Sequence, residues 1–187
     1  MDDKRFINDY LDRYRQSLFE TDVSKELVQM KEMLLEVKEH GNKVIVAGNG
    51  GSAAIASHTA VDFTKRAGIR MINFNEASLI TCFANDYGYE EWVSKAIEFY
   101  GDKDDIAILI SSSGSSLSMI NAAKAAKKLD MQVITFTGFD EDNILKRNGC
   151  LNFWLNSRAY NVVENTHQIW LLIVCDLVIG KVEYPAK

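Results

Sequence analysis

The chain has 187 residues, of which 47% are hydrophobic and 25% are charged, and its formal net charge is −5. This size and balance predict one folded domain with a full core, and they exclude a disordered or low-complexity protein. The negative charge and the lack of a long basic run argue against nucleic acid as a partner.

The apolar segments and the cysteines predict a cytoplasmic protein without a membrane span. The charged first residues are not followed by the apolar core of a signal peptide. The longest apolar stretch, residues 169–179, is shorter than a bilayer requires and contains Asp176. The three cysteines lack metal-type spacing, so we expect buried free thiols rather than disulfides. They are Cys82, Cys150 and Cys175.

Two helices are expected before the first strand, as a helical extension over residues 1–40. Apolar residues recur with a helical period in residues 3–19 and again in residues 24–39. Such helices either pack on a neighbouring subunit or cover the sheet of their own chain, and the pattern favours neither.

A strand, a glycine turn and a helix follow. Residues 43–47 form a short apolar run that is typical of a central strand. Residues 48–51, Gly-Asn-Gly-Gly, let a ligand approach the main chain, and Ser52 is a suitable N-cap for a helix that runs to about residue 66. On this helix His58 and Asp62 are four residues apart and share a face. An ordinary tight turn is the alternative interpretation.

Strands and helices alternate along the rest of the chain. Residues 84–89 are expected as a polar loop. Five strands alternating with helices predict an α/β three-layer sandwich with a five-stranded parallel sheet, as one domain over residues 1–187 with its α/β core at 41–187. Beyond the first unit we expect strands at 69–74, 106–110, 131–136 and 150–155, and helices at 77–83, 90–100, 117–129, 141–148 and 160–181.

A serine loop at residues 111–116, Ser-Ser-Ser-Gly-Ser-Ser, joins the strand at 106–110 to the helix at 117–129. Hydroxyl and N–H groups at a helix N-terminus suit a phosphate monoester. Ligands of parallel sheets bind outside the carboxyl ends of the strands, so this loop and the glycine turn are expected to lie together. A flexible serine-rich loop is the alternative, but the strongly patterned strand and helix on either side disfavour it.

Three motifs resemble those of the sugar isomerase (SIS) domain, and within it those of the phosphoheptose isomerases. They are Gly48-Asn-Gly-Gly-Ser52, Asn85-Asp-Tyr-Gly88 and Ile110-Ser-Ser-Ser-Gly-Ser-Ser116. The resemblance implies a flavodoxin-like fold and an enzyme that converts sedoheptulose 7-phosphate to D-glycero-D-manno-heptose 7-phosphate. It also implies a homotetramer with sites between subunits, in which the opening and last helices build the interface.

The resemblance implies roles for single residues as well. His58 matches a histidine that is a metal ligand in some members of the family, and Glu164 matches a glutamine that helps to bind sugar or metal. Substrate binding would fall to residues of both turns and of the 85–88 motif. The phosphate would be held by Ser111, Ser112, Ser113 and Ser116, the sugar chain would contact Asn49, Gly50 and Ser52, and Asp86 would contact a sugar hydroxyl.

Two departures from the family pattern affect the chemistry. Asp62 stands where the family has a catalytic glutamate and is one methylene shorter, and a base must reach its proton within hydrogen-bond distance. Leu172 stands where the family has a catalytic histidine. Either His167 or Glu164 replaces that histidine, or the isomerase chemistry is altered or lost.

An enediol isomerisation needs a base and a second acid/base or a metal. We expect Asp62, Glu164 and His167 as catalytic residues. We expect His58, Asp62 and Glu164 as ligands of Zn²⁺ or another divalent ion, and no nucleotide cofactor. Two alternatives stay open: an SIS relative that acts on another sugar phosphate, and a non-catalytic module that binds a phosphosugar or a protein.

Overall fold

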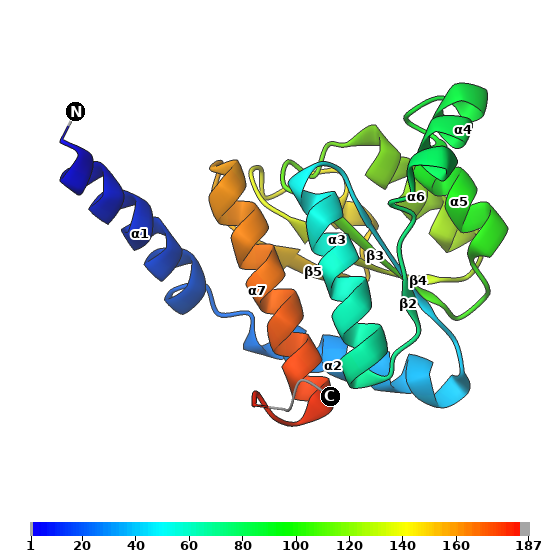
Figure 1. Cartoon of the computed structure of the whole chain (residues 1–187), viewed down its shortest axis with the longest axis horizontal. Helices are drawn as coiled ribbons and strands as arrows, with labels where there is room; N and C mark the ends of the chain where they lie inside the picture. Colours follow the sequence, from blue (N-terminus) through cyan, green and yellow to red (C-terminus); the bar gives the residue numbers. More distant parts are fainter. Residues whose placement is uncertain (1, 184–187) are drawn as a thin grey trace.

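A five-stranded parallel sheet forms the middle layer of the fold (Figure 1). The structure is a computed structural model and describes residues 2–183. The strand order is β2-β1-β3-β4-β5, which is the flavodoxin-like order, so the predicted fold class is confirmed. The strands are β1 (Val44–Gly48), β2 (Met71–Ile72), β3 (Ile106–Ser111), β4 (Gln132–Thr137) and β5 (Leu151–Trp154).

Helices cover both faces of this sheet. On one face lie α2, α3 and α7, and on the other lie α4, α5 and α6 (Figure 1). Two short turns of other helix types, π-helical η1 and 3₁₀ η2, complete the fold. The helical elements are α1 (Asp3–Phe19), α2 (Ser24–His40), α3 (Gly51–Asp62), η1 (Phe63–Ala67), α4 (Ala77–Tyr87), α5 (Trp92–Tyr100), α6 (Leu117–Lys128), η2 (Lys146–Asn148) and α7 (Tyr160–Ile179).

The two cores follow from side-chain alternation in the central strands. In β1, Val44 and Val46 join the core under α2, α3 and α7, while Ile45 and Ala47 join the core under α5 and α6. Every residue of β1 and β3 is buried, as expected for central strands of a parallel sheet. The continuous apolar runs in the sequence predicted these strands for that reason.

The edge strand and the polar loop differ from expectation. Of residues 69–74 only Met71 and Ile72 pair in the sheet, because β2 is an edge strand with a neighbour on one side. Residues 84–87 are the last turn of α4 rather than loop, and the Phe83 and Tyr87 rings pack one turn apart at 5.8 Å.

The helix expected at 141–148 is wrong except for its last residues, which form η2. The Asn143 amide donates to the Asp140 carbonyl and to Thr137 Oγ1, and its oxygen accepts from the Lys146 N–H. A side chain that bonds the backbone in this way competes with helix formation.

All three cysteines are free thiols, as expected, but only Cys175 is buried, whereas Cys82 and Cys150 are exposed. Within residues 2–183, α7 is the one helix long and apolar enough to cross a membrane by length and composition. A core helix has the same property, and Val163, Leu171 and Val174 of α7 are completely buried.

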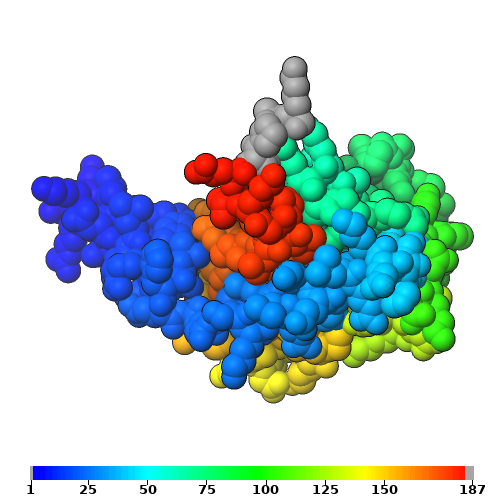
Figure 2. All heavy atoms as spheres, turned by 90° about the horizontal axis from the view of Figure 1, so that it is seen from below, coloured from blue at the N-terminus to red at the C-terminus, as the bar shows by residue number. Residues whose placement is uncertain are grey.

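α1 projects from the rest of the molecule, as Figures 1 and 2 show. Within the chain it is attached to α7, since Asn165 donates a 2.7 Å hydrogen bond to Tyr14 Oη. Phe6, Ile7 and Leu11 on α1 stay more than half exposed, at 54%, 54% and 59%. α2, by contrast, buries Met30 and Leu34 completely on its own chain, so the two opening helices differ in role.

Candidate functional site

Asn49 joins the glycine turn to the serine loop. Its amide Nδ2 donates to Ser116 Oγ and to Ser118 Oγ, both at 2.9 Å. Its amide oxygen accepts a 3.2 Å hydrogen bond from Tyr89 Oη. The carboxamide is therefore held from both sides, and the two polar turns form one surface, as the sequence predicts.

The sheet register explains this convergence. β1 and β3 are neighbours, and Gly48 at the end of β1 pairs with Ile110, one residue before the serine loop. The chain passes from β1 to β2 on one side and then returns to β3 on the other, which makes the gap between β1 and β3 the topological switch point. Ligands of open α/β sheets bind at such a point.

The serine loop is compact and partly buried. Ser111 and Ser112 are 7% and 5% exposed, and the Gly114 N–H donates to the Ser111 carbonyl at 3.0 Å. Ser113 Oγ accepts from the Ser115 hydroxyl at 2.9 Å. These contacts favour a structured turn over the alternative of a flexible serine-rich loop.

Two features of the loop suit an anion. Ser112 Oγ is buried and has no hydrogen-bond partner within residues 2–183. Ser116 is the N-cap of α6 and makes no side-chain capping bond. The first turn of a helix presents free N–H groups, and an orphan hydroxyl is costly unless a ligand satisfies it.

The glycine turn starts α3 two residues earlier than expected. Gly50 is the N-cap, with φ 56° and ψ −124°, a conformation that favours glycine. Ser52 lies inside the first turn and is 3% exposed, so the expectation that it caps the helix is wrong. A Cβ on Gly48 would lie 2.7 Å from Ser52 Cβ, which shows how closely Ser52 packs on the end of β1.

Glu164 of α7 lies against the start of α3. A Cβ on Gly51 would lie 2.2 Å from Glu164 Oε2, so glycine at this position makes room for the carboxylate. Partial burial raises the pKa of Glu164 above its usual value. Glu164 is thus beside the glycine turn.

His58 and Asp62 form the expected pair, and a residue of α7 completes it. His58 Nε2 lies 3.1 Å from Asp62 Oδ2, and Gln168 Nε2 donates to His58 Nδ1 at 2.8 Å. Asp62 is the last residue of α3, directly before the π-helical turn η1. Such turns are common near functional residues.

Asp62 is the last residue of α3, whereas Glu164 of α7 packs against Gly51, the first residue of α3. Asp62 is eleven residues beyond Gly51, which at about 1.5 Å per residue is about 16 Å along the axis. Asp62 instead faces Cys175 of α7. Burial raises the pKa of the Cys175 thiol to about 12, and the Asp62 carboxylate adds to that effect.

This separation bears on the expected metal site. Within the described residues, no group of three or more His, Cys, Asp and Glu side chains is placed to hold a metal ion. His58 and Asp62 pair with each other, whereas Glu164 packs against Gly51 at the start of α3. The three expected ligands therefore do not fit one ion within one chain, and metal binding stays a prediction.

His167 is not part of this surface, and its expected catalytic role disagrees with its placement. The ring is completely buried, and Nε2 lies 3.0 Å from the Thr137 carbonyl. Burial lowers its pKa to about 4, and the rings of Phe136 and Trp170 pack around it. The three-residue spacing from Glu164 suggested a shared face, but α7 turns His167 toward the sheet. Leu172 is half-buried.

Asp86 lies on α4, outside the surface that Asn49 organises. Its carboxylate accepts from Asn85 Nδ2 at 2.9 Å, and Cys82 Sγ lies 3.7 Å away. Tyr89, three residues later, does donate a hydrogen bond to Asn49. Tyr89, Ser118 and Gln168 were therefore missed, because only tertiary packing brings them to the site.

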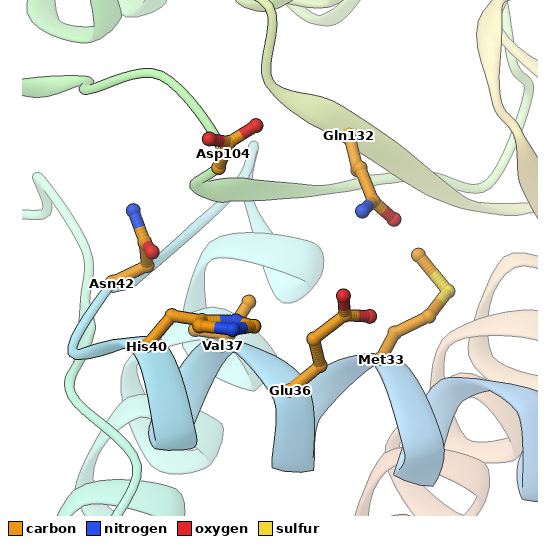
Figure 3. Close-up of a pocket in the computed structure, with 7 residues that line it drawn as sticks. All are labelled: Met33, Glu36, Val37, His40, Asn42, Asp104 and Gln132. Carbon is orange, nitrogen blue, oxygen red and sulfur yellow. The ribbon is translucent and has the colours of Figure 1, made fainter.

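A separate cavity of about 370 Å³ lies at the amino edge of the sheet (Figure 3). Glu36 and His40 of α2 face Asp104 and Gln132 across it. The serine loop is at the carboxyl edge, the full length of β3 away, so this cavity is not the candidate site.

Comparisons with known proteins agree with the fold. The SIS domain model matches residues 8–138. A phosphoheptose isomerase of Helicobacter pylori is 33% identical over 162 residues, 83% of this chain and 84% of that protein.

Two solved structures are similar over nearly the whole chain. A phosphoheptose isomerase from Francisella tularensis has a TM-score of 0.89 at 26% identity, covering 97% of this chain and 100% of that one. One from Neisseria gonorrhoeae has a TM-score of 0.85 at 28% identity, covering 95% and 99%. The chain therefore belongs to the SIS domain family, in the group of the phosphoheptose isomerases.

Proposed function

We propose that the protein is an aldose–ketose isomerase that converts sedoheptulose 7-phosphate to D-glycero-D-manno-heptose 7-phosphate. The observation that carries the proposal is the Asn49 junction, which makes one polar surface from the glycine turn and the serine loop. The similarity to phosphoheptose isomerases supports the choice of a seven-carbon substrate.

The serine loop is the proposed phosphate site. Its hydroxyls and the free N–H groups of α6 supply many donors to a phosphate monoester. The glycine turn lies beside it and would contact the sugar chain through Asn49, Gly50 and Ser52. We assign the phosphate to Ser111, Ser112, Ser113 and Ser116.

Asp62 is the proposed base. It takes a proton from C1 of the ketose, the electrons form the C1=C2 double bond of an enediol, and the C2 carbonyl oxygen gains a proton. The proton returned to C2 and the loss of the O1 proton give the aldose, so no co-reactant is needed. Glu164, whose pKa is raised by burial, suits the transfer between the oxygens.

We further propose a cytoplasmic homotetramer with sites between subunits. The exposed apolar side chains of Phe6, Ile7 and Leu11 on α1 support an interface there. The distance between Asp62 and the start of α3 supports sites that combine residues of different subunits.

A second candidate function is favoured by Leu172 and the burial of His167. A leucine transfers no proton, and a completely buried imidazole does not reach a substrate. A member that binds a phosphosugar without isomerising it, or that acts on another sugar phosphate, would tolerate both. Binding of the sugar phosphate without proton exchange would identify the non-catalytic binding protein.

The test is incubation with sedoheptulose 7-phosphate in deuterated water, with and without Zn²⁺, followed by NMR. We expect the heptose product and deuterium at C2. Asp62→Asn should retain binding and lose exchange, whereas Ser113→Ala should weaken binding. Neither product nor deuterium under either condition would overturn the isomerase proposal, and full activity of Asp62→Asn would overturn the base.

A further inference from the structure

We propose that Asn143 is a positioning residue for the phosphate site: from the turn after β4 (residues 138–145), it holds the serine loop in the shape that receives the ligand. The inference rests on the proposed function, in which the serine loop binds the phosphate of the substrate. Asn143 is only 6% exposed, and its side-chain hydrogen bonds go to groups of the protein. It therefore acts on the ligand through the loop and not by direct contact.

Three hydrogen bonds fix the Asn143 carboxamide. Nδ2 donates to Thr137 Oγ1 at 3.1 Å and to the Asp140 carbonyl at 2.9 Å, and Oδ1 accepts from the Lys146 N–H at 2.9 Å. Thr137 is the last residue of β4 and is completely buried. Because the amide nitrogen and the amide oxygen are both engaged, the side chain is tied to the end of a core strand.

The carboxamide lies against Gly114 of the serine loop. Gly114 has φ 64°, a conformation that favours glycine, and a Cβ at this position would overlap the Asn143 carboxamide and lie 2.7 Å from Asn143 Cβ. The Leu145 N–H also donates to the Gly114 carbonyl at 3.0 Å. The turn therefore contacts Gly114 both with a side chain and with a main-chain donor.

The same turn engages carbonyl groups of the serine loop. The Gly138 N–H donates to the Ser112 carbonyl at 2.9 Å, as the Leu145 N–H does to the carbonyl of Gly114. A carbonyl oxygen repels a phosphate, so its engagement by the turn favours a loop that presents hydroxyl and N–H groups to the ligand. A loop that already has its binding shape loses less conformational entropy when the ligand binds.

Calorimetry with inorganic phosphate tests the role of Asn143 directly. Asn143→Ala removes the carboxamide beside Gly114, and we expect the Kd for phosphate to rise at least about tenfold. The KM for sedoheptulose 7-phosphate should rise by a similar factor, with kcat changed less than about twofold, because the proposed base Asp62 lies on another helix. A Kd equal to that of wild type, or a lower kcat with unchanged KM, would overturn the proposal.

Asn152→Ala is the matched control, because Asn152 has the same kinds of contact elsewhere. It accepts a 2.6 Å hydrogen bond from the hydroxyl of the completely buried Thr135, donates to the Gly149 carbonyl, and lies where a Cβ on Gly149 would overlap it. Both alanine variants should lower the Tm of the ligand-free protein, but Asn152→Ala should bind phosphate like wild type. If both weaken phosphate binding equally, the effect is a general loss of stability and the proposal fails.

Hydrogen exchange in the wild-type protein is a second measurement, which needs no variant. If the turn holds the loop, a ligand that stabilises the loop must stabilise the turn in return. Saturating phosphate should therefore slow exchange of the Gly138 and Leu145 N–H groups at least about fivefold more than that of the Gly149 N–H. The Gly149 N–H is a suitable reference because it donates to the Lys146 carbonyl and not to the loop. Equal slowing of all three would contradict the proposed coupling.

The outcomes separate this inference from the proposed function. A wild type that binds phosphate, with equal affinity of Asn143→Ala, would overturn the role of Asn143 alone. A wild type that binds no phosphate would overturn the phosphate site and the inference with it. A wild type that binds phosphate but does not isomerise the sugar would overturn the proposed reaction, while the Kd values would still decide the role of Asn143.

Discussion

The amide of Asn49 donates a 2.9 Å hydrogen bond to Ser116, although 67 residues separate them in the chain. The same amide nitrogen reaches Ser118, so one side chain joins the end of β1 to the start of α6. The geometry of the phosphate site therefore depends on a residue that the sequence presents as part of another turn.

Replacing Asn49 with alanine should weaken sugar phosphate binding. The change leaves the buried Ser118 hydroxyl short of a partner and frees the two turns to separate, at a cost of about 1–3 kcal/mol. We expect the Kd for sedoheptulose 7-phosphate, measured by calorimetry, to rise at least about tenfold. Gln29→Ala, which removes an exposed amide on α2, is the control, and equal affinity of Asn49→Ala and wild type would contradict the prediction.

Removing the Ser112 hydroxyl should separate binding from stability. This buried hydroxyl has no partner within residues 2–183, so Ser112→Ala should leave the free energy of unfolding of the ligand-free protein unchanged or raise it by up to about 1 kcal/mol. The same variant should lose the stabilisation that added inorganic phosphate gives the wild type in thermal denaturation.

The matched control for Ser112 is Ser118→Ala. Ser118 is also a buried serine, but its hydroxyl accepts from Asn49, so its loss should destabilise the ligand-free protein by about 1–2 kcal/mol. If both alanine variants lose the same stability, Ser112 is an ordinary hydrogen-bonded serine.

His167 should make the fold sensitive to acid. Burial lowers its pKa to about 4 from 6.5, so the unfolded chain binds a proton that the folded chain refuses between these values. The free energy of unfolding should therefore fall as the pH drops from 6.5 towards 4, by up to about 3 kcal/mol from this residue. Urea titrations of wild type and His167→Gln measure it as the part of the pH dependence that the variant lacks. The same slope in both proteins would contradict the prediction.

Introducing charge on α1 should reduce the assembly. Leu11 is 59% exposed in the single chain, and a lysine there would bring an unpaired charge into an apolar interface. Light scattering after size-exclusion chromatography should give a smaller mass for Leu11→Lys than for wild type. Val182→Lys, at a 77% exposed site, is the control. An unchanged mass for Leu11→Lys would place the interface elsewhere.

Most of the fold follows from local patterns. Continuous apolar runs predict the central strands because residues such as Ile108 and Leu109 are buried from both faces of the sheet. Such patterns do not reveal an element whose conformation depends on one side chain. Asn143 replaces a helix with a turn by bonding the backbone, and no periodicity reveals that.

The candidate site could likewise be predicted where chain order or helix spacing determines it, but not where packing between helices does. Chain order places both turns at the carboxyl edge, and helix spacing places His58 beside Asp62. The partner Gln168 depends on how α7 packs on α3, which spacing within either helix does not specify. His167 was expected at the site because its neighbours in sequence are polar. The side chain instead lies on the side of α7 that faces the sheet, and it is completely buried.

The length of α3 has a consequence for mixtures of inactive proteins. With about 16 Å between the two ends of the helix, the group that binds phosphate and the group that moves the proton need not belong to the same polypeptide. Co-expressing Ser113→Ala with Asp62→Asn should then restore part of the activity that each variant lacks alone, because some hybrid assemblies contain one intact site. Such rescue between chains would show that each active site is built from residues of two subunits.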